Sequence, residues 1–209
     1  QLHQARDDED NSEIRRRSRL YSLVPLTEIC QRGWIRCWES FEKLEKEVCH
    51  FLDIATLDEV PRLAVSFRQS DIGDPEVAAE MAWVKRVEHL AHRQTVGDFD
   101  RRRLEAALPE LVSYAGAVQD LGRVPPFLHD QGVHFVIVPH LSKTYLDGAA
   151  FRLNGNPVVA MTLRHDRIDN FWFTMLHELA HIVAGHEGGY LDDLEEEADT
   201  PEEVEANRL

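Results

Sequence analysis

Apolar residues recur at three- and four-residue steps through the N-terminal half of the chain. Over residues 34–52 this spacing places them on one face of a helix, while glutamates and lysines cover the other face. Similar spacing predicts a second helix over 76–92 and a third over 100–121. Residues 1–19 are polar and carry blocks of like charge, which is typical of a solvated helix or linker. We therefore expect a helical region over residues 1–123.

The pattern becomes strand-like after the Pro125-Pro126 pair. Three short apolar runs, at 133–138, 149–153 and 158–163, have the length of buried strands. Asn154-Gly155 lies between the last two runs, and Asn-Gly between strand-like segments is a strong hairpin signal. The sequence thus predicts a small sheet that contains a hairpin.

A further helix is predicted to follow this sheet. Asp169 is placed to cap it, and the apolar stretch 171–176 leads into the run His177-Glu178-Leu179-Ala180-His181. We expect an α+β fold, in which residues 124–209 form a second domain with a short sheet and a helix that carries this run.

The run matches HExxH, a pattern typical of zinc hydrolases. His177 and His181 are four residues apart, so on a helix both imidazoles project from one face and can bind the same ion. Glu178 lies beside them, where it can take a proton from a water molecule on the metal. The motif also occurs by chance, but here it lies on an apolar helix that follows a predicted sheet.

Catalytic zinc commonly has three protein ligands, so the motif needs a third. We prefer Glu203 because Asn207 lies one helical turn beyond it, with Glu205 as the second choice. Glu195 is the third choice, because little chain separates it from His181. Four other histidines are expected to be structural or exposed: His134, His140, His165 and His186.

Composition narrows the classes of partner and location. The net charge of −15 disfavours nucleic acid as a partner of this chain, because such binding depends largely on Lys and Arg. No long apolar run or signal-like N-terminus is present, so we expect a cytoplasmic protein without a membrane span. The three cysteines, Cys30, Cys37 and Cys49, are then expected to be reduced. Because the chain starts at Gln1 and stops at Leu209 inside a predicted helix, we expect it to be part of a longer protein.

Several strings resemble the ImmA/IrrE metallo-endopeptidase family over about residues 132–209. They are the segment from Leu146 to Phe151, residues 157–163, the segment from Arg164 to Phe173, the HELAH run, and residues 203–207. Upstream, Arg32-Gly33-Trp34-Ile35 and residues 67–70 are similar to the helical linker of longer members. Those members carry an N-terminal helix-turn-helix domain of the XRE type, absent here, and some are described as HigA-like antitoxins.

The resemblance implies a zincin-like domain and a zinc site. His177, His181 and Glu203 would be the ligands of Zn²⁺, and Glu178 the base. It also implies an endopeptidase that cleaves a protein regulator such as a transcriptional repressor, in stress response or toxin–antitoxin control. DNA would be contacted only through the missing domain, and an oligomer is compatible with this reading. We expect an extended substrate to add to the sheet edge along residues 149–153.

The alternative is a regulatory or antitoxin module whose metal site is inactive. The acidic surface would then bind a basic toxin or another subunit. A retained Glu178 argues against this alternative, because a purely structural metal site needs no base.

Overall fold

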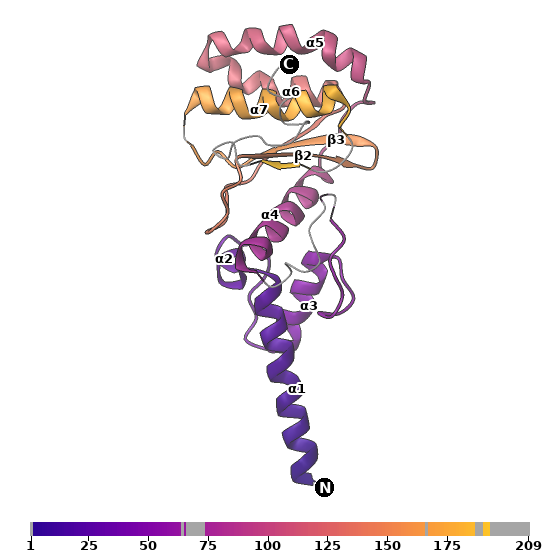
Figure 1. Ribbon diagram of the computed structural model, residues 1–209, viewed down its shortest axis with the longest axis vertical. Helices are drawn as coiled ribbons and strands as arrows, with labels where there is room; N and C mark the ends of the chain where they lie inside the picture. Colours follow the sequence, from indigo (N-terminus) through magenta and orange to yellow (C-terminus); the bar gives the residue numbers. More distant parts are fainter. Residues whose placement is uncertain (1, 64, 66–73, 166, 187–189, 193–209) are drawn as a thin grey trace. The chain divides into compact units, whose positions relative to one another are not determined.

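Helices and a small sheet make up the computed structural model, which describes residues 2–63, 65, 74–165, 167–186 and 190–192 (Figure 1). The expected α+β class is confirmed. The chain divides into two compact units. The first comprises residues 1–63, 67–85 and 141–144, and the second comprises residues 64–66, 86–140 and 145–209.

The first unit is helical. It contains α1 (Leu2–Leu23), α2 (Leu26–Gln31), α3 (Phe41–Leu52) and the N-terminal part of α4 (Pro75–Ala91). The helix predicted over 76–92 is therefore confirmed, but the one predicted from residue 34 begins only at Phe41. The interruption has a local cause, because Gly33 has a positive φ of 67° and turns the chain after α2.

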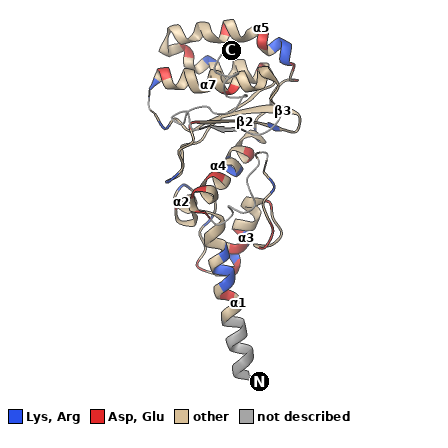
Figure 2. Ribbon diagram, in the orientation of Figure 1, with Lys and Arg blue, Asp and Glu red and all other residues tan. Residues whose placement is uncertain are grey.

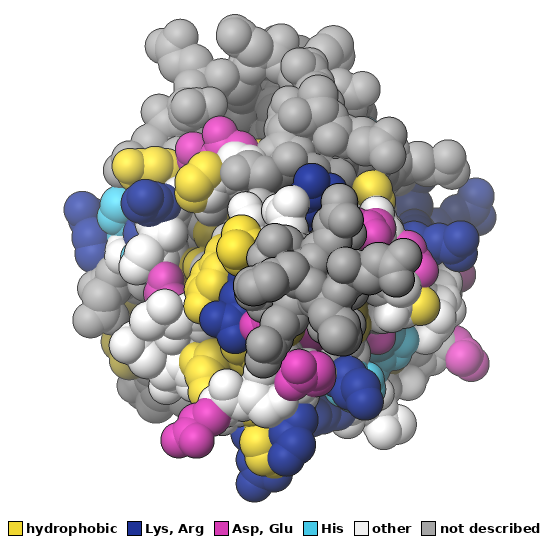
Figure 3. Space-filling model, turned by 90° about the horizontal axis from the view of Figure 1, so that it is seen from below, with side chains coloured by type: hydrophobic (Ala, Val, Ile, Leu, Met, Phe, Trp, Pro, Cys, Tyr) yellow, Lys and Arg dark blue, Asp and Glu magenta, His cyan; other side chains and the backbone are white. Residues whose placement is uncertain are grey.

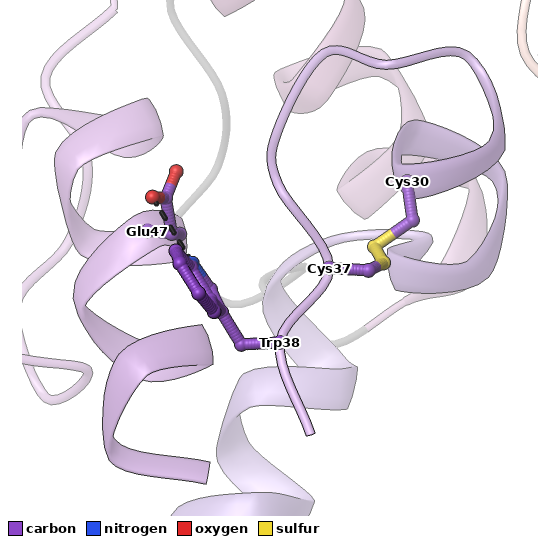
Figure 4. Close-up of a disulfide and its surroundings, with 4 residues drawn as sticks. All are labelled: Cys30, Cys37, Trp38 and Glu47. Carbon is purple, nitrogen blue, oxygen red and sulfur yellow. Dashed lines mark hydrogen bonds between the residues drawn. A yellow bond between two sulfur atoms is a disulfide. The ribbon is translucent and has the colours of Figure 1, made fainter. Parts of the chain in front are cut away.

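A disulfide joins Cys30 at the end of α2 to Cys37, with 5.6 Å between the two Cα atoms (Figure 4). The expectation that all three cysteines are reduced is thus wrong for this pair, whereas Cys49 is free and buried. Next to the disulfide, Trp38 donates a hydrogen bond from its indole Nε1 to Glu47 of α3 at 3.2 Å (Figure 4). These two links hold the loop between α2 and α3.

Helices α1 and α3 are joined by charged and aromatic contacts. Arg16 forms a salt bridge with Glu45, and the guanidinium groups of Arg16 and Arg17 lie about 5 Å from the ring centre of Phe41. Figure 2 shows basic residues on α1 and acidic residues on α3 in this region. Exposed pairs of this kind add little to the free energy of unfolding, because solvent screens their charges.

The second unit begins before the expected domain boundary at residue 123. It includes α5 (Arg101–Ser113), which Asp100 caps by accepting from the backbone N–H of Arg103 at 2.7 Å. The helix predicted over 100–121 ends at Ser113 and continues as two 3₁₀ segments, η2 (Tyr114–Gly116) and η3 (Val118–Arg123). A short helix, α6 (Val124–Asp130), follows where the Pro125-Pro126 pair was expected to end helical structure. Prolines are compatible with the first turn, where the N–H groups have no helical acceptor.

In the described part of the chain, the sheet has four strands in the order β1-β3-β2-β4. They are β1 (His134–Ile137), β2 (Gly148–Leu153), β3 (Asn156–Met161) and β4 (Tyr190–Asp192). Strands β2 and β3 form the predicted hairpin, and the turn residues Asn154 and Gly155 have φ values of 52° and 93°. Both values are positive, as a type I′ turn requires. Strand β1 pairs with β3 in parallel.

Helix α7 (Ile168–Ala184) packs on β2 and β3, and α5 packs on α7 (Figure 1). This packing explains why α5 belongs to the second unit. Asp169 is not the N-cap, because α7 begins at Ile168 with Arg167 as its N-cap. Asp169 accepts from the Arg167 guanidinium instead. One core joins these elements, and its members are Leu104, Leu111, Tyr114, Val124, Leu128, Val133, Phe135, Ala150, Val159, Met161, Trp172, Met175, Leu179, Ile182 and Val183.

Charges of both signs are interspersed on the face shown in Figure 3. Among the described side chains of that face, no continuous basic surface is seen. In the part of the chain that the structure describes, no helix combines the length and the apolar character needed to cross a membrane.

Glu80 on α4 makes the stability of the fold depend on pH. Burial, together with the nearby carboxylates of Glu76 and Asp74, raises the pKa of Glu80 from 4.5 to about 7. Because the folded-state pKa exceeds that of the unfolded chain, the stabilisation is complete below pH 4.5 and is lost as pH rises through about 7. We expect the free energy of unfolding to fall by about 1–3 kcal/mol from acidic to mildly alkaline pH.

Urea unfolding at a series of pH values measures this dependence. Glu80→Gln should remove most of it, whereas Glu105→Gln on the exposed side of α5 should leave it unchanged. An unchanged dependence in Glu80→Gln would assign the effect to another group.

Candidate metal centre

Helix α7 buries the three polar residues of the motif. His177 is 4% exposed, Glu178 is 0% exposed and His181 is 1% exposed. Apart from Thr174, the other buried positions of the helix are hydrophobic, and it ends at Gly185, whose φ of 78° is left-handed. Burial of three polar side chains on one helix is unusual for a purely structural element, since such groups need partners in the interior.

The two histidines point at a common position. Their Nε2 atoms lie 3.1 Å apart, and the ring centroids are separated by 4.8 Å. Two imidazoles on a tetrahedral zinc ion, each at about 2.0–2.1 Å, have nitrogens roughly 3.3 Å apart. The observed separation therefore fits two ligands of one ion, with little movement of either ring.

His186 contacts the other ring nitrogen of His181, the one that does not face His177. Its Nδ1 lies 2.9 Å from Nδ1 of His181, on the side of the ring opposite Nε2. The left-handed Gly185 turns the chain back, so the backbone N–H of His186 also donates to the carbonyl of His181 at 3.1 Å. If Nδ1 of His181 donates to His186, Nε2 carries the lone pair that a metal needs.

His186 was expected from the sequence to be structural or exposed, and the structure places it in contact with His181. The sequence does contain a feature that predicts this contact, because Gly185 directly precedes His186. Glycine directly after a helix commonly adopts the left-handed conformation and reverses the chain, which brings the next residue back toward the last turn.

Glu178 lies against the start of β2. A Cβ atom built on Gly148 would collide with its Oε1 atom and would lie 3.0 Å from its Cδ. The same Cβ would lie 2.9 Å from the methyl group of Thr174, one turn earlier on α7. The carboxylate of Glu178 thus occupies the space that any larger residue at position 148 would fill.

Phe173 flanks the histidines on the solvent side. It lies one turn before His177, its ring stacks on that imidazole with 6.2 Å between centroids, and it is 54% exposed. An exposed aromatic ring here is compatible with contact to an apolar group of a ligand.

The loop before α7 contacts the residues that directly precede β2. Asp147 is buried, and its Oδ1 lies 3.7 Å from Nε2 of His165 and 3.8 Å from Nε of Arg164. The Thr162 hydroxyl donates to the carbonyl of Leu146 at 2.8 Å. These contacts hold the loop before α7, and they give His165 the structural role expected of it.

The candidates for a third ligand lie outside the described residues. Glu203, Glu205 and Glu195 all lie outside them, so the choice between these carboxylates stays a prediction. Within the described ranges, no cluster of three or more His, Cys, Asp or Glu side chains could hold a metal ion by itself.

The expected substrate edge along residues 149–153 needs correction. Strand β2 is central at its N-terminal end, because Gly148 to Ala150 pair with β3 on one side and with Asp192 to Tyr190 of β4 on the other. Among the strands that the structure describes, β1 and β4 are instead the outer ones. A peptide could add beside β4 at this end of the sheet, but not beside Gly148 to Ala150 while β4 is in place.

Comparison with known proteins does not identify a family. No protein-family model matches the chain, and no curated protein or solved structure matches it significantly. The arguments for a function therefore rest on the residues and on their geometry.

The arrangement predicts a specific pattern of metal loss. His177→Ala combined with His181→Ala should abolish binding of about one zinc ion per chain, because both nitrogens that converge are removed. His186→Ala should weaken zinc binding by about 10- to 100-fold, as the loss of an outer hydrogen-bond partner does. Competition with a chelator, followed by elemental analysis, measures both effects.

His140→Ala, in the loop after β1, serves as the matched control and should bind zinc normally. Full zinc occupancy in the double variant would place the site elsewhere. Wild-type affinity in His186→Ala would leave His186 as part of the helix end alone.

Proposed function

We propose that this protein is a zinc-dependent endopeptidase with a zincin-like catalytic domain. The observation that carries the proposal is the 3.1 Å separation of the His177 and His181 Nε2 atoms on a buried helix that also presents Glu178. A structural metal site would not require a carboxylate directly beside its ligands.

The ligands and the base have separate tasks. His177 and His181 would hold the ion, and His186 would orient His181 from behind. Bound zinc would lower the pKa of a water molecule to about 7 and polarise the scissile carbonyl. Glu178 would take the proton from the attacking water and pass it to the leaving amine.

Burial favours proton transfer by Glu178. The carboxylate is 0% exposed, so bulk water does not compete for it, and its contact with Gly148 limits its movement. A fixed base beside an ordered reactant gains much of its effect from orientation. We infer that substrate reaches the site along the solvent side of α7, where Phe173 is exposed.

The resemblance to ImmA/IrrE proteins supports a protein regulator as the substrate, such as a transcriptional repressor. Some residues of the resemblance lie next to one another in the loops before β2 and α7. Asp147 and Gly148 belong to one string of the resemblance, and Arg164 and His165 belong to another. We propose cleavage of a repressor within an extended segment that can align beside a strand.

Replacement of the base separates catalysis from metal binding. Glu178→Gln keeps the size of the side chain but removes the basic carboxylate, so zinc should remain while hydrolysis falls by a factor of about 10² to 10⁴. The assay follows cleavage of a purified repressor by mass spectrometry. Asp169→Asn on the exposed first turn of α7 is the control and should cleave at the wild-type rate.

Equal cleavage by wild type and Glu178→Gln would exclude Glu178 as the base and would point to a contaminating protease. If neither protein cleaves any partner but both regulate it equally in cells, the inactive regulatory module becomes the better account.

The third ligand is tested by three single substitutions. We expect Glu203→Ala to lower zinc affinity by about 10-fold or more, since a direct ligand should matter at least as much as an outer partner. Glu205→Ala and Glu195→Ala should keep the wild-type affinity, and each serves as a control for the other. Loss of zinc in either of these variants, with normal binding in Glu203→Ala, would reassign the ligand.

A further inference from the structure

Gly148 occupies a position in the sheet that does not favour glycine. It pairs with Met161 of β3 on one side and with Asp192 of β4 on the other. Glycine in the interior of a sheet loses more backbone entropy than other residues and has no side chain to pack. A specific reason must therefore offset this cost.

Backbone conformation is not that reason. The glycines with positive φ are Gly33, Gly132, Gly155 and Gly185, so Gly148 is outside this group among the described residues. Its backbone is that of an ordinary strand residue, and alanine could adopt it without strain. The remaining explanation is close approach of another group.

Two side chains of α7 make that approach. The nearest atom to a Cβ at position 148 is Oε1 of Glu178, and the next is the methyl carbon of Thr174 at 2.9 Å. Glu178 and Thr174 are one helical turn apart and both are buried, Thr174 to 1% exposure. The space at Gly148 is thus filled by the carboxylate first and by helix packing second.

We propose that Gly148 is a positioning residue for the general base, and that its missing side chain sets where the Glu178 carboxylate lies. The role of the base rests on the proposed function, whereas the steric relation between the two residues does not. A methyl group at position 148 would push the carboxylate along the helix axis or rotate it away from β2. Either movement changes the angle at which the carboxylate meets the attacking water.

The first measurement needs no activity. The Tm of the full chain is measured with and without zinc. The effect of Gly148→Ala on Tm is compared between the wild-type protein and the Glu178→Ala variant. Gly148→Ala should lower Tm by about 3 °C or more in the wild-type background. In the Glu178→Ala background the same substitution should lower Tm by much less, because the colliding carboxylate is gone.

Thr174→Ser tests the competing explanation. It removes the methyl group that a Cβ at position 148 would meet but keeps the hydroxyl that accepts from Asn170 at 3.5 Å. The loss of Tm caused by Gly148→Ala should persist in this background. If Thr174→Ser removes the loss and Glu178→Ala does not, Gly148 serves helix packing alone and the proposal is overturned.

The second measurement follows hydrolysis. Gly148→Ala should lower kcat by roughly 10- to 100-fold, in line with the effect of misplacing a catalytic group by about 1 Å. KM and zinc content should stay at their wild-type values. In the Glu178→Gln background, Gly148→Ala should cause no further loss, because it acts through the carboxylate that is already absent. A lowered zinc content, or a raised KM with normal kcat, would contradict the positioning role.

If Gly148→Ala folds poorly, a second substitution that relieves the collision with Glu178 still tests the proposal. Glu178→Asp shortens the side chain by one methylene group and withdraws the carboxylate from the space at position 148. The double variant Gly148→Ala, Glu178→Asp should then be more stable than Gly148→Ala and as active as Glu178→Asp alone. Gly122→Ala is the control, because a Cβ there meets nothing within 4 Å.

The two proposals fail in different ways. If the wild-type protein cleaves no substrate, the endopeptidase function fails, and the unfolding data still decide whether Gly148 and Glu178 are coupled. If the wild type cleaves and the two positions show no coupling in Tm or kcat, the function stands and the role of Gly148 is overturned.

Discussion

The close packing of α7 on the start of β2 is the constraint on which the second unit depends. This helix buries His177, Glu178 and His181 along with its apolar residues, so polar groups lie in the interior of the unit. Buried polar groups destabilise a fold unless partners surround them closely. On one side the carboxylate of Glu178 packs against Gly148 of β2, and at the end of the helix the chain reversal returns His186 to His181, where the two Nδ1 atoms lie 2.9 Å apart.

Contacts between residues close together in the sequence could be predicted from it, whereas contacts between distant residues could not. The four-residue step between His177 and His181 fixes a shared helix face, so their convergence followed from local geometry. The hairpin at Asn154-Gly155 was likewise encoded in two residues whose conformations a tight turn requires. By contrast, the contact of Gly148 with Glu178 links positions 30 residues apart in the sequence, and no local pattern marks it. Only the register of β2 and its distance from α7 reveal it.

Three predictions that the structure contradicts also failed for physical reasons: the start of the helix at residue 34, the reduced cysteines and the sheet edge. Periodicity alone extended a helix back to residue 34, but Gly33 and the Cys30–Cys37 disulfide impose a loop there. An odd number of cysteines was read as three free thiols, although a pair seven residues apart can close a short loop. The edge predicted along residues 149–153 is wrong for Ala149 and Ala150, because β4 comes from beyond α7 and pairs with them, and three residues are too short a run to be recognised as a strand.

Metal binding and stability should be coupled in this architecture. The Nε2 atoms of His177 and His181 face each other at 3.1 Å inside a buried region, so protonating both would place two like charges in contact. A cation held by two neutral imidazoles would avoid that repulsion and would be bound only when α7 is folded. Binding to the folded state alone stabilises it by mass action. On the proposed function, the polar face that weakens α7 as a core helix would therefore stabilise the fold once an ion is bound.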